Sequence, residues 1–192
     1  MFNSPLRYPG GKGRVSQYVI DLIETNGLTG GHYVETYAGG AGIAIALLYL
    51  EYASHVHLND VDPAVYSFWK SLVDQPDDLA RLVRDTPLTL EERDRQKAAY
   101  RAEDSSVLER GFAMFYLNRV NRSGIIHGGV IGGNHQSGAY KIDARFNRAE
   151  LVRRIEKVAS YAPRISVHNQ DAADFIANEL PKIKDQTLVY LD

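Results

Sequence analysis

The stretch from Val34 to Leu48 constrains the fold more than any other part of the sequence. It begins with a short β-favouring run, passes through Gly39, Gly40 and Gly42, and ends in an apolar series suited to a buried helix. Glycines at such a turn adopt backbone angles that other residues resist, and they let a ligand approach the main chain closely. The stretch therefore predicts a strand, a glycine turn and a helix, with a small-molecule site at the carboxyl end of the strand.

A second predicted strand, at residues 55–58, runs into Asn59 and Asp60. It follows the glycine turn by roughly twenty residues, the spacing at which nucleoside and dinucleotide sites place an acid for the ribose hydroxyls. A glycine turn alone also occurs for packing reasons, so the acidic strand end is the feature that favours a cofactor. The two features leave open which cofactor binds.

The rest of the chain alternates predicted strands and helices, with one interruption. We expect helices at residues 15–25, from residue 63, at 172–180 and at about 147–161, and strands at 164–168 and 187–191. The block from 76 to 117 has no strand signals and reads as a helical insertion. We therefore expect one α/β cofactor-binding domain made of residues 1–74 and 147–192, interrupted by residues 75–146.

Three predicted strands end in an acidic residue, namely Asp60, Asp171 and Asp192. Ligands bind at the carboxyl ends of the strands in open α/β sheets, although any one of these acids could also be a helix cap. Earlier, the segment from Arg7 to Lys12 has a lysine at a glycine turn before a helix, which suits an anionic group. It does not match a phosphate loop, because Gly13 stands where a serine or threonine is needed.

Composition excludes several classes of protein. The chain has no cysteine, which removes disulfides, thiolate zinc sites and sulfur nucleophiles, and we expect no metal site. The longest apolar run, at residues 43–50, is too short to span a bilayer and no signal pattern begins the chain, so we expect a cytoplasmic protein without membrane contact. The net charge is −2. Any contact with DNA must therefore come from a local patch.

Six segments in a fixed order carry a resemblance to a known family. They are Arg7–Lys12, Glu35–Gly42, Leu58–Asp60, Phe115–Arg119, His168–Asp171 and Val189–Asp192. Together they resemble the Dam-like DNA adenine-N6 methyltransferases of bacteria and their phages, and the resemblance spans nearly the whole chain. The resemblance implies an α/β Rossmann-like fold with a helical and loop target-recognition insertion and with the C-terminal part of the sheet missing.

The resemblance implies S-adenosylmethionine as the cofactor, bound at the carboxyl edge of the sheet. Asp60 would hold its ribose, and Asp171 would lie beside its adenine ring. The lysine of the first motif would lie near an anionic part of the cofactor. The implied cofactor-binding residues are Tyr8, Lys12, Tyr37, Gly39, Gly40, Asp60, Asp171 and Asp192.

Asp192 would also be the catalytic residue, as the first residue of the family's Asp-Pro-Pro-Tyr motif. The exocyclic amine of adenine is a poor nucleophile because its lone pair is delocalised into the ring. Hydrogen-bond acceptors on the amine localise that pair and aim it at the methyl group. No covalent intermediate is needed, which suits a chain without cysteine.

Double-stranded DNA would be the substrate, and the target adenine would have to flip out of the duplex to be methylated. The segment from about 118 to 146 would read neighbouring base pairs. Its side chains able to reach base edges or phosphates are Arg119, Asn121, Arg122, Asn134, His135 and Gln136. Arg119 could equally close the preceding helix. A companion restriction endonuclease would be a further partner.

Three other functions stay open at this point. Because the sequence stops at Asp192, the rest of the catalytic motif is missing. We therefore expect little or no activity from the chain as written, and a non-catalytic relative that binds only cofactor or DNA is the main alternative. A nicotinamide-dependent oxidoreductase would use the same glycine turn and acid, but nothing resembles a hydride-transfer acid partner. Methylation of RNA differs only in the substrate.

Overall fold

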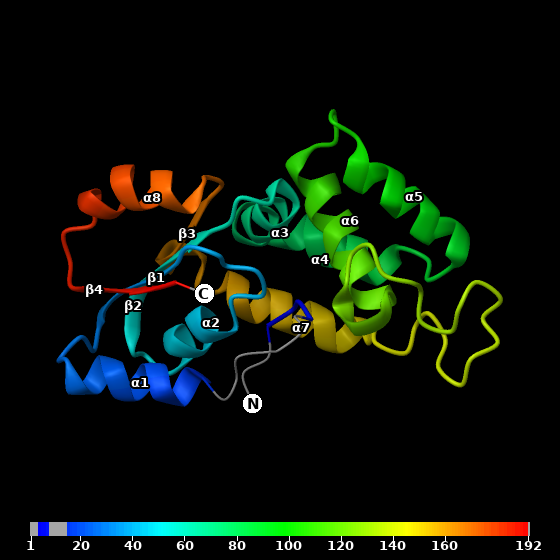
Figure 1. Cartoon of the computed structure of the whole chain (residues 1–192). Coiled ribbons are helices and arrows are strands. Elements are labelled where there is room, and N and C mark those ends of the chain that lie inside the picture. Colours follow the sequence, from blue (N-terminus) through cyan, green and yellow to red (C-terminus); the bar gives the residue numbers. More distant parts are fainter. Residues whose placement is uncertain (1–3, 8–14, 192) are drawn as a thin grey trace. The chain divides into compact units, whose positions relative to one another are not determined.

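Four short strands form a sheet in which all of them run in the same direction (Figure 1). The computed structural model describes residues 4–7 and 15–191. The strands are β1 (Gly31–Glu35), β2 (Ala53–Asn59), β3 (Ile165–His168) and β4 (Thr187–Tyr190), in the spatial order β3-β2-β1-β4. Each neighbouring pair is parallel. The carboxyl ends of the strands therefore share one edge of the sheet.

The chain divides into two compact units. The sheet unit contains the described residues of Met1–Ser4, Gly10–Tyr66 and Ser160–Asp192. The helical unit contains those of Pro5–Pro9 and Ser67–Ala159. Each unit has its own buried core, so each is described by itself.

These units do not divide the chain at the borders that the sequence pattern suggests, 74/75 and 146/147. One border falls inside α3 (Pro63–Asp74), and the other follows α7 (Arg148–Ala159). Helix α7 joins the helical unit because it buries an apolar face of Leu151, Val152, Ile155 and Val158 there. The assignment of cofactor and target binding to separate domains stays a prediction.

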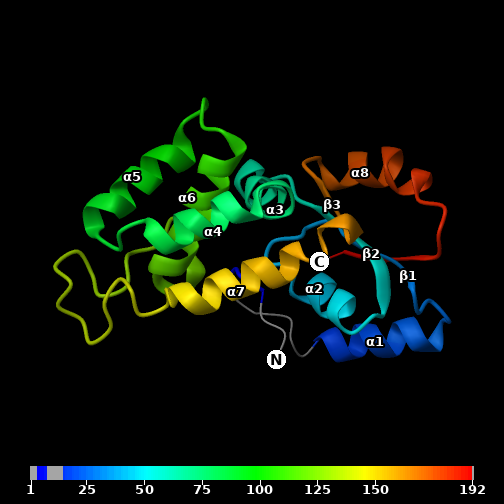
Figure 2. The ribbon, with the colours of Figure 1, turned by 180° about the vertical axis from the view of Figure 1, so that it is seen from behind.

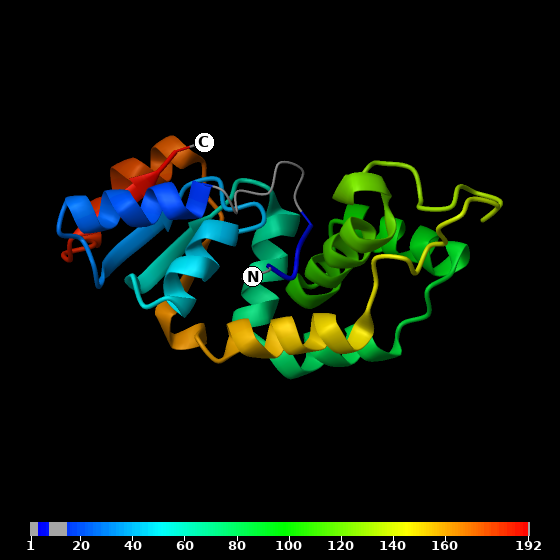
Figure 3. The ribbon, with the colours of Figure 1, turned by 90° about the horizontal axis from the view of Figure 1, so that it is seen from below.

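In the sheet unit, helices cover both faces of the sheet. Helices α1 (Val15–Thr25) and α2 (Gly42–Tyr49) lie on one face, and α8 (Ala172–Asn178) lies on the other (Figures 1 and 3). The predicted helix at 15–25 is confirmed with the same bounds. Every residue from Ile43 to Leu48 of α2 is buried. A helix that is apolar on all sides needs such a fully buried position.

In the helical unit, α6 (Val107–Val120) is the central helix, and all its residues from Gly111 onward are buried. Helix α5 (Leu90–Arg101) packs along α6, and α4 (Pro76–Asp85) packs along α7 (Figure 2). Helix α3 approaches α6 so closely that a Cβ on Gly111 would lie 2.5 Å from the carbonyl oxygen of Ser67. Only glycine fits there.

The segment between α6 and α7 contains little regular structure. It holds a single antiparallel bridge between Asn121 and Val130 and a turn of 3₁₀ helix at Arg122–Gly124. Two further 3₁₀ turns, Ala162–Arg164 and Leu180–Lys182, belong to the sheet unit. Among the described residues, no helix combines the length and the apolar character that a membrane span requires.

Four histidines lie side by side across the face of the sheet that α8 covers. His32 comes from β1, His55 and His57 come from β2, and His168 comes from β3 and packs edge-on against Phe175 of α8. Neighbouring ring centroids are 4.8 to 5.9 Å apart. The Nδ1 atom of His32 lies 3.1 Å from Nε2 of His57. We call this set the histidine row.

Three rings of the histidine row, those of His55, His57 and His168, favour the neutral imidazole. Burial, together with the charges of the other three rings, lowers the pKa of His57 to about 3. Burial also lowers the pKa values of His55 and His168, the first with help from His32 and Arg164. The Nε2 atom of His168 is buried without a hydrogen-bond partner among the described residues. In the unfolded chain all these groups return to a pKa of about 6.5.

The histidine row should make the stability of the fold depend on pH. Below about pH 6.5 the unfolded chain binds protons that the folded chain does not. The unfolding free energy therefore decreases as the pH is lowered, until the pH reaches the pKa of the folded state. For His57 this window extends down to about pH 3. The loss is about 1.4 kcal/mol per pH unit for each histidine that stays neutral in the folded state.

Urea denaturation of the wild type and of His57→Gln at about pH 7.5 and about pH 5 measures this contribution. His57→Gln should lose less stability between the two conditions than the wild type does. His135→Gln removes an exposed histidine of the irregular segment and should keep the wild-type pH dependence. Equal losses in His57→Gln and the wild type would contradict the assignment.

Candidate functional site at the carboxyl edge of the sheet

The predicted glycine turn and the predicted acid are joined by a direct hydrogen bond. After β1 the chain turns through Gly39, whose φ is +45°, and α2 begins at Gly42. The backbone N–H of Gly39 donates to Oδ2 of Asp60 at 2.9 Å. The two sequence features that indicate a cofactor therefore meet at one place.

The carboxylate of Asp60 keeps room for a ligand. Its second oxygen, Oδ1, accepts from the backbone N–H of Asp62 at 3.0 Å. Burial raises the pKa of Asp60, while the N–H groups of Gly39 and Asp62 lower it. Each carboxylate oxygen has a second lone pair. Because Asp60 is only half-buried, those lone pairs can accept from the two hydroxyls of a ribose.

Asn59 holds two of the strand ends together, a role that the sequence reasoning missed. Its side chain is fully buried. The amide nitrogen donates to the carbonyls of Thr36 and Gln170, both at 3.0 Å, and the amide oxygen accepts from the N–H of Gln170 at 3.1 Å. The signal that could have revealed it is a polar residue in the last position of a buried strand.

Glu35 is a second residue whose role the sequence reasoning missed. Helix α2 begins after Ala41, which has a φ of +46° and no capping side chain. Glu35, only 3% exposed at the end of β1, accepts from the N–H of Ala44 at 3.2 Å and from the hydroxyl of Tyr33 at 3.3 Å. Its carboxylate thus satisfies the positive end of α2, as a capping side chain would.

The third strand end lies against the second. The side chain of Asn169 donates to the carbonyls of Asp60 at 2.7 Å and Val61 at 3.1 Å. Asp171 accepts from the N–H of Ala173 at 2.8 Å and is the N-cap of α8. The helix-cap alternative is therefore real for Asp171, and its predicted place beside a cofactor ring stays a prediction.

Of the remaining predicted cofactor residues, some lie within the described part of the chain and others do not. The ring of Tyr37 follows β1 and is 49% exposed, so it can pack against a ligand. Tyr8, Lys12 and Asp192 lie outside the described residues. The described end of β4 lies beside β1, where the hydroxyl of Thr36 donates to the carbonyl of Tyr190 at 3.4 Å.

The comparison with known families decides the class of this protein. The model of the D12 class N6 adenine-specific DNA methyltransferase family matches residues 8–192. The chain belongs to this family. A search of curated proteins found no match. The parallel sheet with helices on both faces agrees with the expected Rossmann-like fold of a methyltransferase, and the resemblance seen in the sequence is confirmed.

An adenine-specific DNA methyltransferase needs DNA and a methyl donor. Its family therefore answers the question of reaction class that the glycine turn left open, and it does not support a nicotinamide-dependent oxidoreductase. Within the described residues, no group of three or more histidine, cysteine, aspartate or glutamate side chains could hold a metal ion.

Arg119, a predicted DNA contact of the methyltransferase, lies inside the helical unit. Its side chain is 7% exposed and donates to the carbonyl of Pro5. Burial lowers its pKa to about 9, with help from the charges of Arg154 and Arg7. A base contact does not fit this burial, and the alternative that Arg119 has a structural role is the better interpretation.

The neighbouring Asn118 explains why this position is internal. Its side-chain oxygen accepts from the N–H of Arg7 at 2.7 Å, and its nitrogen donates to the carbonyl of Arg7 at 2.6 Å and of Gly124 at 2.9 Å. One amide thus binds the backbone of residue 7 from both sides. The pair Asn118 and Arg119 attaches residues 5–7 to α6.

Asn121 is also internal, contrary to the prediction that it contacts DNA. Its side chain is fully buried. The amide oxygen accepts from Nε of Arg93 at 2.8 Å, and the amide nitrogen donates to the carbonyls of Ile125 at 3.1 Å and Ile126 at 2.7 Å. Using all these groups to fold the loop leaves none of them for a base edge.

The other predicted DNA contacts differ in exposure. Arg122, Asn134 and His135 are exposed and stay candidates. Gln136 is half-buried and has a φ of +49°. Its amide donates to two carbonyls of the loop, those of Ile131 and Gly133, both at 2.8 Å, and it accepts from the N–H of Ile142 at 2.8 Å. Gln136 therefore shapes the loop.

Replacing Asn59 by alanine should destabilise the fold by about 2–4 kcal/mol, because buried carbonyl and N–H groups at two strand ends would lose their partners. Urea denaturation measures the change. Asn178→Ala is the matched control, since Asn178 is exposed at the end of α8, and it should change stability by no more than about 0.5 kcal/mol. Similar stabilities of the two variants would contradict the role of Asn59.

Proposed function

We propose that the protein transfers the methyl group of S-adenosylmethionine to the N6 amine of an adenine flipped out of double-stranded DNA. The observation that carries the proposal is the match to the adenine-specific family over residues 8–192. The bonded pair of Gly39 and Asp60 supports the cofactor part of it. When bound, S-adenosylmethionine supplies an electrophilic methyl group on a sulfonium.

The residues at the sheet edge fit such a cofactor. The turn at Gly39 brings bare backbone close to the ligand, and the carboxylate of Asp60 has acceptor capacity for a ribose. The exposed ring of Tyr37 offers a flat apolar surface. We propose that Gly40 continues this surface and that Asp171 approaches the adenine ring of the cofactor. Tyr8 and Lys12 complete the proposed set.

The proposed chemistry needs hydrogen-bond acceptors and no nucleophile from the protein. An acceptor on the target amine concentrates its lone pair and holds it in line with the methyl group. We propose Asp192 for this role, because it stands at the start of the segment that resembles the catalytic motif. A carboxylate in such a position polarises the amine and takes part in removing its proton after transfer.

We propose that the helical unit supplies the DNA contacts. The exposed Arg122, Asn134 and His135 lie in the largely irregular segment between α6 and α7. Loops on a rigid scaffold commonly carry recognition. The segment would read base pairs next to the flipped adenine. We place the enzyme, of bacterial or phage origin, in the cytoplasm, with a companion restriction endonuclease as a further partner.

The direct test is methyl transfer. The protein is incubated with S-adenosylmethionine carrying a labelled methyl group and with unmethylated double-stranded DNA, and the nucleosides are analysed by mass spectrometry. Label in N6-methyladenine supports the proposal. Cofactor binding without transfer, both by this chain and by a form extended through Pro-Pro-Tyr and the downstream strands, supports the non-catalytic alternative. Label in RNA but not in DNA would change the substrate.

Asp60→Ala should weaken the binding of S-adenosylmethionine about ten- to a hundredfold, because the ribose hydroxyls lose a charged acceptor. Titration calorimetry measures the dissociation constant. Asp74→Asn, at the exposed end of α3, is the control and should bind the cofactor like the wild type. Unchanged affinity in a folded Asp60→Ala variant would exclude Asp60 from the cofactor site.

A further inference from the structure

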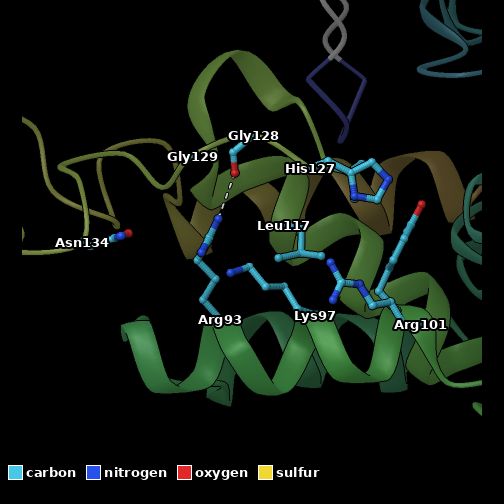
Figure 4. Close-up of a pocket in the computed structure, with 10 residues that line it drawn as sticks. Arg93, Lys97, Arg101, Leu117, His127, Gly128, Gly129 and Asn134 are labelled. Atoms are coloured by element: carbon cyan, nitrogen blue, oxygen red, sulfur yellow. Dashed lines mark hydrogen bonds between the residues drawn. The ribbon is translucent and has the colours of Figure 1, made fainter.

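A pocket of about 290 Å³ lies in the helical unit, between α5 and the segment that follows α6 (Figure 4). One wall comes from α5, with Arg93, Lys97 and Arg101. The opposite wall comes from residues 126–129 and from Asn134. No carboxylate is among the residues that line it. We call this cavity the α5 pocket.

The cations of the α5 pocket share one face of their helix. Arg93, Lys97 and Arg101 are four residues apart, the spacing that brings side chains to the same side of an α-helix. Figure 4 shows Lys97 and Arg101 rising from α5 toward the pocket. Arg95 lies two residues after Arg93 and therefore points away from this face, where it pairs with Glu91 at 2.6 Å.

Arg93 connects the two walls and leaves a positive charge between them. It is 6% exposed. Its Nε donates to the amide oxygen of Asn121 at 2.8 Å, and its Nη2 donates to the carbonyl of Gly128 at 2.9 Å. Both acceptors are neutral. Burial lowers the pKa of Arg93, yet a guanidinium keeps its charge, so an anion in the pocket would be favoured.

Lys97 and Arg101 can bind a ligand without breaking a strong interaction within the protein. The ammonium of Lys97 lies 3.0 Å from Asp94, whose side chain is 72% exposed, and such surface pairs contribute little. Arg101 is exposed and has no ion-pair partner among the described residues. On the opposite wall, His127 packs edge-on against Tyr100 with ring centroids 5.7 Å apart. Lys97 and Arg101 of α5 and His127 of the opposite wall therefore all line the α5 pocket.

A further cation lies at the edge of the α5 pocket. The guanidinium carbon of Arg122 would lie 3.8 Å from a Cβ built on Gly129, which lines the pocket. Arg122 is also one of the exposed residues proposed to reach DNA. The pocket therefore adjoins the proposed recognition surface, and both belong to the helical unit.

We propose that the α5 pocket holds a phosphate group of the DNA backbone, with Lys97 and Arg101 as its cationic contacts. The inference rests on the proposed function, and it adds contacts from α5 that lie outside the segment thought to read bases. Phosphate contacts fix the position and register of a reading segment without carrying sequence information. Arg93 holds that segment against α5, so a phosphate bound in the pocket positions the segment on the duplex.

The test compares the affinity of three forms of the protein for duplex DNA as a function of salt. They are the wild type, the double variant Lys97→Gln/Arg101→Gln, and the control Arg95→Gln, which removes a charge from the opposite face of α5. Fluorescence anisotropy gives the dissociation constants, and thermal melts followed by circular dichroism show that each variant is folded. Several unrelated DNA sequences are used, because a phosphate contact weakens binding equally to all of them.

We expect the double variant to bind DNA about tenfold more weakly at low salt. The plot of log affinity against log salt should also become less steep, its negative slope being smaller in magnitude by about one to two. Arg95→Gln should keep nearly the wild-type slope. If the wild type binds and methylates DNA but the double variant has the salt slope of Arg95→Gln, this inference fails and the proposed function stands. If the wild type binds no DNA, both fail.

A second arm separates backbone phosphate from a free anion. Inorganic phosphate is titrated into each form and followed by amide chemical shifts. Weak phosphate binding that is lost in the double variant, together with the loss of DNA affinity, supports the proposal. Tight phosphate binding with unchanged DNA affinity would overturn it, since the α5 pocket would then be a site for a free anion.

Discussion

The hydrogen bonds that join the strand ends at the carboxyl edge of the sheet are the contacts on which the site depends. The carboxylate of Asp60 binds the glycine turn, and the buried amide of Asn59 binds the loops after β1 and β3. Parallel strands bring their carboxyl ends to one edge, but they do not by themselves hold the loops in place. Buried side chains that leave no donor unpaired supply that order.

The helical unit uses the same physical device with arginine and asparagine. Asn118 binds the backbone of Arg7 from both sides, and Arg93 ties Asn121 and Gly128 to α5. Irregular segments carry backbone groups that no helix or sheet satisfies, so side chains must satisfy them. The polar residues near the end of α6 are therefore occupied inside the unit. The side chains of Arg101 and Arg122 are exposed, and that of Lys97 is partly exposed, so these cations stay accessible to a partner.

Much of the fold could be predicted because hydrophobic periodicity and turn residues are local properties. The helix at 15–25 and the order of strands and helices agree with the structure, since apolar spacing, glycine and proline determine them over a few residues. The compact units were not predictable in this way. Helix α7 reads like any amphipathic helix, and only its packing against α4 shows that it belongs to the helical unit.

The sequence by itself determined the class of protein, the strand and glycine-turn motif, and the acid that meets it. Those features are short, and their chemistry is evident from residue type and order. Only the tertiary structure decided which polar residues are available. Arg119 and Asn121 look like DNA contacts in the sequence, whereas folding buries them. Nothing in the sequence places Lys97 and Arg101 in a pocket, and only the fold brings the segment after α6 beside them. Burial depends on contacts between residues far apart in the chain, and no local pattern records those contacts.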